Sequence, residues 1–374
     1  MKSRQSVSLP DGGSRFETWG RTRAVIALIL LVGTIALGAA VTGSSAPAQG
    51  IKPQASLDWS NSDEGLYKAI IVKVRHGESY YDAAVGEQRA RNYPVRPAIT
   101  VREPGVTYLG AVLGGARHLY WVIAGIGFCM IVALMWRLES IAPGKNTWRV
   151  AVLLSGFFST GVFKPEYAVD TEIWAGVFIM LALISRSLPT FWPSVVFGLL
   201  ACLTRELAFP LLAVMAFFAW REGKRKEAAA WVGTAVVFLG VYAVHLANVA
   251  SVTGPGDPKS QGWLEFGGLP FVVETIRHTS ALIVAPAWVT AVVIPLAVFG
   301  WLSRRSSFAD RVLALLASYF VVFMLIGRTQ NSYWGTLYVS FMGAGLAFSV
   351  SGLLVLVRTI RSGGPSSVAA EGAG

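Results

Sequence analysis

The chain carries at residues 24–43 the stretch AVIALILLVGTIALGAAVTG, which contains no charged side chain. Twenty residues that each rise about 1.5 Å form an α-helix about 30 Å long, the thickness of the hydrocarbon core of a bilayer. The stretch follows directly after the basic residues Arg21 and Arg23. It is therefore predicted to be a transmembrane helix that starts at a basic membrane surface.

Further apolar runs follow this segment along most of the chain. They lie at residues 118–137, 149–163, 172–185, 190–204, 207–220, 228–250, 281–302, 312–327 and 335–357. The pattern predicts an all-α, polytopic transmembrane helical bundle of about ten spans. The runs between 149 and 220 are short for a full crossing, so tilted, internally buried and re-entrant helices are all alternatives there. Residues 104–116 are expected to add a half-helix.

The composition excludes several other classes of protein. Of 374 residues, 54% are hydrophobic and 14% are charged, and the mean hydropathy is +0.54, whereas a soluble protein has about 25% charged residues. The chain is therefore not expected to be a water-soluble enzyme. Its only cysteines, Cys129 and Cys202, lie in apolar runs and are too few for a disulfide scaffold or a zinc site. The net charge of +11 favours contact with membrane lipids over nucleic acid.

Basic residues predict the orientation of the bundle. They gather in the N-terminal tail and after the second, sixth, eighth and tenth spans, at Lys2, Arg4, Arg15, Arg21, Arg23, Arg137, Lys145, Arg149, Arg221, Lys224, Arg225, Lys226, Arg304, Arg305, Arg311, Arg358 and Arg361. By the positive-inside rule this side is the cytoplasm. The expected organisation is a cytoplasmic tail at residues 1–23, a transmembrane domain at 24–357 with an extracytoplasmic loop at 44–117, and a disordered cytoplasmic tail at 358–374.

Polar residues gather on the opposite side in this topology. The second external turn holds Glu166, Asp170 and Glu172, and the third holds Arg205 and Glu206 between two apolar runs. A charge at membrane depth is costly unless it is paired or hydrated. The sequence therefore leaves two alternatives open, an external cavity lined by charge and a tight turn in which Arg205 and Glu206 pair at the surface.

The first external loop contains adjacent acids at the start of a predicted amphipathic helix. Asp63 and Glu64 precede the apolar positions Leu66, Ile70, Ile71 and Val74. Asp63 suits a helix N-cap. It also suits a general base that removes the proton of an acceptor hydroxyl, with Glu64 as a second candidate, and these two roles are compatible.

These features resemble the GT-C superfamily of membrane glycosyltransferases, in the branch of protein O-mannosyltransferases and lipid A aminoarabinose transferases. The resemblance rests on Asp63-Glu64-x-x-Tyr67 and on Leu203-Thr204-Arg205-Glu206. Where aminoarabinose transferases have Lys-Gly, this chain has Arg-Glu, which leaves the partner of Glu206 unexplained. Short supporting motifs are Tyr80-Tyr81, Tyr93-Pro94-x-Arg96-Pro97, Glu172-x-Trp174-Ala175-Gly176, Gly262-Trp263-Leu264-x-Phe266-Gly267-Gly268 and Asn331-x-Tyr333-Trp334-Gly335.

The resemblance implies an inverting glycosyltransferase of a cell envelope, expected in a bacterial inner membrane with its active site outside. It would move a sugar from a polyprenyl-phosphate donor to a glycolipid, polysaccharide or protein. Asp63 would be the base, and Arg205 would hold the donor phosphate, helped by the start of the next helix. Arg328 is a second phosphate ligand or an interface anchor.

The remaining candidates have less specific roles. The acceptor or sugar would contact Glu172, Glu206, Asn331, Tyr333 and Trp263. Glu166 and Asp170 are candidates for a divalent cation such as Mg²⁺ or Mn²⁺, although Asp170 also suits the N-cap of the next helix.

Two other function classes fit the same composition. A transporter or flippase of lipid-linked saccharide also places charged residues in a bundle, but the sequence has no repeated halves. A non-catalytic assembly subunit of the same fold would not need its acids. A transporter is expected to need acids at the membrane midplane, an enzyme to need Asp63, and an assembly subunit to need neither.

Overall fold

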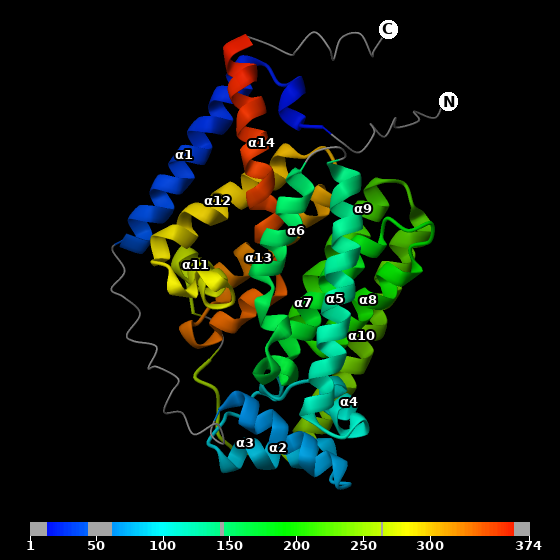
Figure 1. Cartoon of the computed structure of the whole chain (residues 1–374). Helices are drawn as coiled ribbons and strands as arrows, with labels where there is room; N and C mark the ends of the chain where they lie inside the picture. Colours follow the sequence, from blue (N-terminus) through cyan, green and yellow to red (C-terminus); the bar gives the residue numbers. More distant parts are fainter. Residues whose placement is uncertain (1–12, 44–61, 143–145, 263–264, 363–374) are drawn as a thin grey trace.

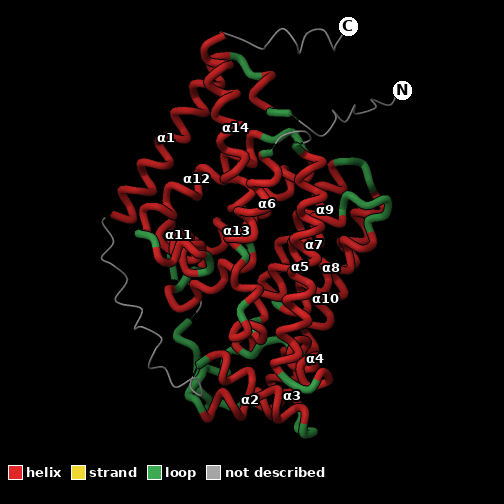
Figure 2. Tube along the Cα trace, in the orientation of Figure 1, coloured by secondary structure: helices red, strands yellow, loops and turns green. Residues whose placement is uncertain are grey.

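The computed structural model describes residues 13–43, 62–142, 146–262 and 265–362. These residues fold into a bundle of helices (Figures 1 and 2), with no strand among them. The predicted all-α class is therefore confirmed. Three predicted features lie outside the described residues: the first part of the predicted external loop (residues 44–61), Trp263 and the predicted tail beyond Ser362.

Five of the described helices are long and apolar enough to cross a membrane. They are α1 (Arg21–Gly43), α5 (Ala116–Ile141), α10 (Arg225–Val252), α13 (Ser307–Ile326) and α14 (Ser340–Ser362). Large apolar side chains on their outer faces are exposed, including Ile29 on α1 and Val236 on α10. Exposed apolar surface on this scale matches hydrocarbon as the solvent. The predicted membrane protein with several transmembrane helices is supported.

Shorter apolar helices complete the bundle. They are α6 (Thr147–Phe158), α7 (Thr171–Ser185), α8 (Trp192–Thr204), α9 (Phe209–Arg221) and α12 (Ala287–Ser303). Every residue of α7 is buried, so neighbouring helices enclose this short apolar segment. This is one of the alternatives that the sequence left open for the short runs.

Close helix contacts at α14 depend on glycine. A Cβ added to Gly300 of α12 would lie 1.8 Å from the carbonyl oxygen of Gly345 in α14. A Cβ added to Gly343 would lie 2.3 Å from the backbone of Leu154 in α6. Small residues allow helix backbones to approach this closely in membranes. Two helices that precede it in the chain, α12 and α6, therefore pack closely on α14.

Three amphipathic helices form the end of the molecule opposite to the start of α1 and the end of α14 (Figure 1). They are α2 (Asp63–Arg75), α3 (Tyr80–Ala90) and α4 (Gly105–Leu113), and a 3₁₀ turn, η4 (Ala98–Thr100), lies between α3 and α4. Helix α2 buries Leu66, Ile70 and Ile71, as the sequence predicted. Helix α4 is the predicted half-helix.

Several predicted boundaries are wrong because the backbone breaks inside apolar runs. The runs 149–163, 281–302 and 335–357 each include a separate 3₁₀ segment or part of one. The short segments of the connections are η5 (Thr160–Phe163), η6 (Pro165–Val169), η7 (Glu206–Ala208), α11 (Gly268–His278), η8 (Ala281–Val284) and η9 (Thr329–Leu337). Hydropathy detects burial in an apolar environment and does not distinguish an α-helix from a 3₁₀ turn.

The described residues of both predicted tails are folded. A 3₁₀ turn, η1 (Arg15–Thr18), packs on the bundle, and the Phe16 side chain is fully buried. The Thr359 hydroxyl donates a hydrogen bond to the carbonyl oxygen of Phe16 at 3.1 Å. Residues 358–362 belong to α14, so this part of the predicted disordered tail is helical.

Replacing Gly300 by alanine is expected to lower the thermal unfolding temperature of the detergent-solubilised protein. The added methyl group would overlap the Gly345 carbonyl, and overpacking of this kind costs about 1–3 kcal/mol. Gly240→Ala is the matched control, because a Cβ there meets nothing within 4 Å and alanine favours the helix. Equal unfolding temperatures for the two variants would show that the α12–α14 contact is looser than described.

Candidate functional site

A buried ion cluster lies at the turn between α8 and α9, which the sequence predicts to be external. The Arg205 side chain is 1% exposed, and its Nε lies 2.7 Å from Oε1 of Glu172. Its Nη1 donates hydrogen bonds to both carboxylate oxygens of Glu206 at 2.7 Å. The predicted pairing of Arg205 with Glu206 is present, but Glu172 is a further partner and the group is enclosed instead of lying at the surface.

Local sequence explains why these groups meet. Helix α8 ends at Thr204, whose hydroxyl bonds back to the carbonyl oxygen of Leu200 at 3.0 Å, and Arg205 has an extended backbone. Pro210 lies in the first turn of α9. This position suits proline because backbone N–H groups in the first turn have no acceptor within the helix. Glu172 lies in the first turn of α7, where a negative charge is favoured.

A second Arg-Glu pair, Arg102 and Glu103, joins this cluster from the segment before α4. Glu103 Oε1 accepts a hydrogen bond from the backbone N–H of Glu206 at 3.0 Å. Arg102 Nη2 lies 3.5 Å from Glu172 Oε1 and donates a hydrogen bond to the Tyr333 hydroxyl at 2.8 Å. The five residues Arg102, Glu103, Glu172, Arg205 and Glu206 are called the ion cluster below.

Asp63 lies at the open side of this region. Its carboxylate accepts a hydrogen bond from the Tyr93 hydroxyl, and its side chain is exposed. The N-cap of α2 is Ser62, whose side chain accepts a hydrogen bond from the Gly65 N–H at 3.1 Å. The predicted capping role of Asp63 is therefore wrong, because Ser62 occupies that position and Asp63 is the first residue of the helix.

Tyr67 lies within electrostatic range of both Asp63 and the ion cluster. Burial raises the pKa of Tyr67, and the charges of Arg102, Asp63 and Glu172 all act on it. The pKa of Asp170 is raised well above its usual value by burial and then by Glu172, Glu64 and Asp63. These mutual influences place the first turn of α2 and the start of α7 around one polar region.

The surroundings of Glu103 favour its neutral form. Burial raises the pKa of Glu103 well above its usual value, and the Glu206 carboxylate raises it further. Protonation of Glu103 would leave two carboxylates in the ion cluster against the two guanidinium groups of Arg102 and Arg205, which is the balance that a buried group of charges requires.

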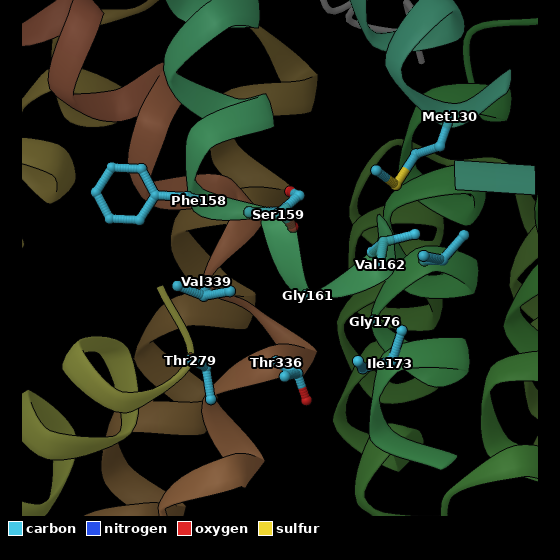
Figure 3. A pocket seen from close by; sticks show the side chains of 12 residues that line it. Met130, Phe158, Ser159, Gly161, Val162, Ile173, Gly176, Thr279, Thr336 and Val339 are labelled. Carbon is cyan, nitrogen blue, oxygen red and sulfur yellow. The ribbon is translucent and has the colours of Figure 1, made fainter. Parts of the chain in front are cut away.

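The contact between η9 and α7 places Tyr333 beside Glu172. A Cβ added to Gly176 of α7 would lie 2.3 Å from the carbonyl oxygen of Thr336, so glycine allows η9 to lie directly on α7. Figure 3 shows the small cavity next to this contact, lined by Ser159, Gly176 and Thr336 among others. Its volume of about 20 Å³ gives room for about one water molecule.

The structure brings together seven of the predicted residues and separates others. Contacts and electrostatic effects given above place around the ion cluster Asp63, Glu64, Asp170, Glu172, Arg205, Glu206 and Tyr333. Arg328 instead contacts the preceding loop, where its Nη2 donates to the carbonyl oxygen of Gln261 at 3.1 Å and its Nε lies 3.3 Å from Glu265. Asn331 is half-buried in η9, and Trp263 lies outside the described residues.

The two candidate metal ligands have different surroundings. Glu166 lines a pocket of about 510 Å³ with the basic residues Lys68 and Arg117, whereas Asp170 lies toward Asp63 and Glu172. Asp170 also occupies the N-cap position of α7 without making a side-chain capping bond. Within the described ranges, no group of three or more His, Cys, Asp or Glu residues is arranged to hold a metal ion.

Arg102 is a residue of the site for which no role was predicted. A signal for it exists, because Arg102-Glu103 is the same dipeptide as Arg205-Glu206 and both pairs stand just before a helix. The repeated pair predicts two similar turns, but only the fold shows that they meet. Tyr93 appeared only as part of a motif, and its contact with Asp63 spans 30 residues.

Replacing Glu103 by glutamine is expected to increase stability more at pH 8 than at pH 4. A carboxyl group whose folded pKa is raised stabilises the fold below its unfolded pKa of about 4.3 and loses that contribution as pH rises. Glutamine keeps the acceptor for the Glu206 N–H and has no charge. The measurement is the unfolding temperature of both proteins across this pH range.

Glu87→Gln is the matched control with the opposite sign. Hydrogen bonds from Lys73 and Arg91 lower the pKa of Glu87, so its contribution is present at neutral pH and is lost on acidification. Glu87→Gln should therefore be less stable than the parent at pH 8, with a smaller difference at pH 4. A pH-independent difference for Glu103→Gln would contradict the protonated state assigned to Glu103.

Comparisons of the chain with protein-family models, with curated proteins and with solved structures find no match. The family of the chain therefore stays a prediction from the sequence motifs. Function has to be inferred from the chemistry of the ion cluster, Asp63 and their surroundings.

Proposed function

We propose that the chain is a membrane glycosyltransferase of the GT-C type that uses a polyprenyl-phosphate sugar donor. The observation that carries the proposal is the meeting of Asp63, the ion cluster and Tyr333 at one end of an apolar bundle. Transfer of a sugar from a lipid phosphate needs a base for the acceptor and cationic or hydroxyl groups that stabilise the leaving phosphate. The site holds a carboxylate, two guanidinium groups and hydroxyl groups. The exposed apolar faces of the bundle suit a donor that lies in a membrane.

The proposed topology has ten crossings, made by α1, α5, α6, α7, α8, α9, α10, α12, α13 and α14. Alternation then puts the start of α1 and the end of α14 on one side, which agrees with Figure 1. The positive-inside rule makes that side the cytoplasm. The ion cluster then faces the outside of a bacterial inner membrane, and both ends of the chain are cytoplasmic.

In the proposed reaction, Asp63 takes the proton of an acceptor hydroxyl. The Tyr93 hydroxyl orients the Asp63 carboxylate. Because the Asp63 side chain is exposed, an acceptor can reach it. The acceptor oxygen forms a bond to the anomeric carbon while the bond from that carbon to the phosphate oxygen breaks. The electron pair leaves with the polyprenyl phosphate, and the configuration at the anomeric carbon inverts.

The phosphate that leaves is assigned to Arg102, with Arg205 behind it. Arg102 is 12% exposed whereas Arg205 is 1% exposed, so Arg102 is the more accessible guanidinium. Within the described residues, the hydrogen bond that Arg102 donates is the one to Tyr333 from Nη2, which leaves Nε and Nη1 for phosphate oxygens. Guanidinium groups bind phosphate through two parallel hydrogen bonds.

Other predicted residues take supporting roles in this proposal. Glu172 and Glu206 hold Arg205 and Arg102 in position, and Tyr333 orients Arg102. Glu64, Asn331 and Trp263 remain candidates for contact with the sugar or the acceptor. Because Glu166 and Asp170 do not share surroundings, the reaction proposed here uses only the side chains of the chain.

Replacing Asp63 by asparagine is expected to lower sugar transfer by at least about a hundredfold, the usual effect of removing a general base. The assay would use the purified protein with a panel of polyprenyl-phosphate sugars and would follow loss of the donor. Asp82→Asn is the matched control, because Asp82 is another exposed aspartate in the first turn of a helix, and it should keep parental activity.

Three results distinguish the rival functions. Equal turnover by the parent and Asp63→Asn would remove Asp63 from the reaction. Movement of an intact lipid-linked saccharide across vesicles without cleavage of the donor would support a transporter. Absence of donor cleavage and of movement with the whole panel would favour an assembly subunit.

A further inference from the structure

A polar pocket of about 280 Å³ lies at the end of the bundle remote from the ion cluster. It is lined by residues that include Arg137, Arg186, Glu222, Lys224 and Arg311. The length of helix α7 gives the distance between this pocket and the ion cluster, because Glu172 lies in its first turn and Arg186 follows its last residue. Fourteen steps of about 1.5 Å place the two sites about 20 Å apart.

The pocket carries more positive than negative charge. Arg311 Nη2 and Lys224 Nζ both lie 2.6 Å from Glu222, and Arg186 pairs with the buried Glu227. Arg137 is a fourth cation, and its Nη1 donates a hydrogen bond to the Ser140 hydroxyl at 3.0 Å. The described residues around the pocket thus hold four cations beside the two carboxylates of Glu222 and Glu227, and a bound anion would reduce this excess of positive charge.

Two of the cationic side chains are buried. Arg311 is 2% exposed and Arg137 is 7% exposed. Their guanidinium groups lie over the rings of Phe218 and Phe308, at 5.1 Å and 5.2 Å. The buried Nε of Arg311 has no hydrogen-bond partner in the described part of the chain.

The N-terminus of α13 adds to the positive electrostatic potential of the pocket. Ser307, the first residue of this 20-residue helix, lines the pocket, and the N-terminus of a helix favours an anion. Arg311 lies one turn further along and donates from Nη1 to the carbonyl oxygen of Ser307 at 3.0 Å. Buried arginines beside a helix N-terminus are the donor set that binds phosphate.

We propose that this pocket is a second site, which binds a phosphate group at the opposite membrane surface from the ion cluster. The group belongs either to the head of an anionic phospholipid or to a soluble phosphate compound. Basic pockets between membrane helices recognise lipid phosphate in this way. The site does not depend on the proposed transferase reaction, because it shares no residue with the ion cluster.

The test is native mass spectrometry of the detergent-purified full chain with phosphatidylglycerol, phosphatidylcholine or inorganic pyrophosphate. Arg137→Gln should weaken binding of the anionic probe about tenfold, the effect of one charge-assisted hydrogen bond. Glu222→Gln should strengthen it, because Arg311 and Lys224 then face the anion without a competing carboxylate. Lys226→Gln is the matched control, an exposed lysine of the same turn that does not line the pocket.

Each arm of this test has a defined consequence. Binding of phosphatidylglycerol alone identifies a lipid head group, and binding of pyrophosphate identifies a site open to the aqueous phase. The proposal is overturned if neither probe binds the parent more tightly than phosphatidylcholine does. It is also overturned if Glu222→Gln fails to bind more tightly than Lys226→Gln, a result that is informative even where Arg137→Gln does not fold.

Discussion

The contact of Arg205 with Glu172 and Glu206 is the interaction on which the arrangement of the candidate site depends. An arginine that is 1% exposed must have its charge balanced, because removing one partner of a buried ion pair costs about 3–5 kcal/mol. The partners come from the start of α7 and from the turn itself, while Glu103 holds the Glu206 backbone from a third segment. One guanidinium therefore fixes the relative positions of segments that are distant in the chain.

Helix α7 connects two polar regions of the molecule. It is wholly enclosed, with Glu172 of the ion cluster in its first turn and Arg186 of the basic pocket directly after its last residue. The close approach of η9 at Gly176 then brings Tyr333 to Arg102 and completes the polar region.

The sequence predicts features that depend on local pattern. The apolar runs, the amphipathic helix α2 and the pairing of Arg205 with Glu206 all follow from residues that are near one another in the chain. The role of Arg102 does not, because its partners Glu172 and Tyr333 are 70 and 231 residues away. Glu166 and Asp170 are close in sequence, yet the η6 turn directs them to different surroundings. The cap at Asp63 was misassigned because Ser62, one residue earlier, is an equally good capping residue.

The most direct measurement is an experimental structure of the protein with a bound polyprenyl phosphate. The account predicts phosphate oxygens within hydrogen-bond distance of the Arg102 guanidinium, on the side of the ion cluster that faces Asp63. A phosphate bound only at the Arg137 and Arg311 pocket, or only beside Arg328, with the ion cluster closed and unchanged, would contradict it.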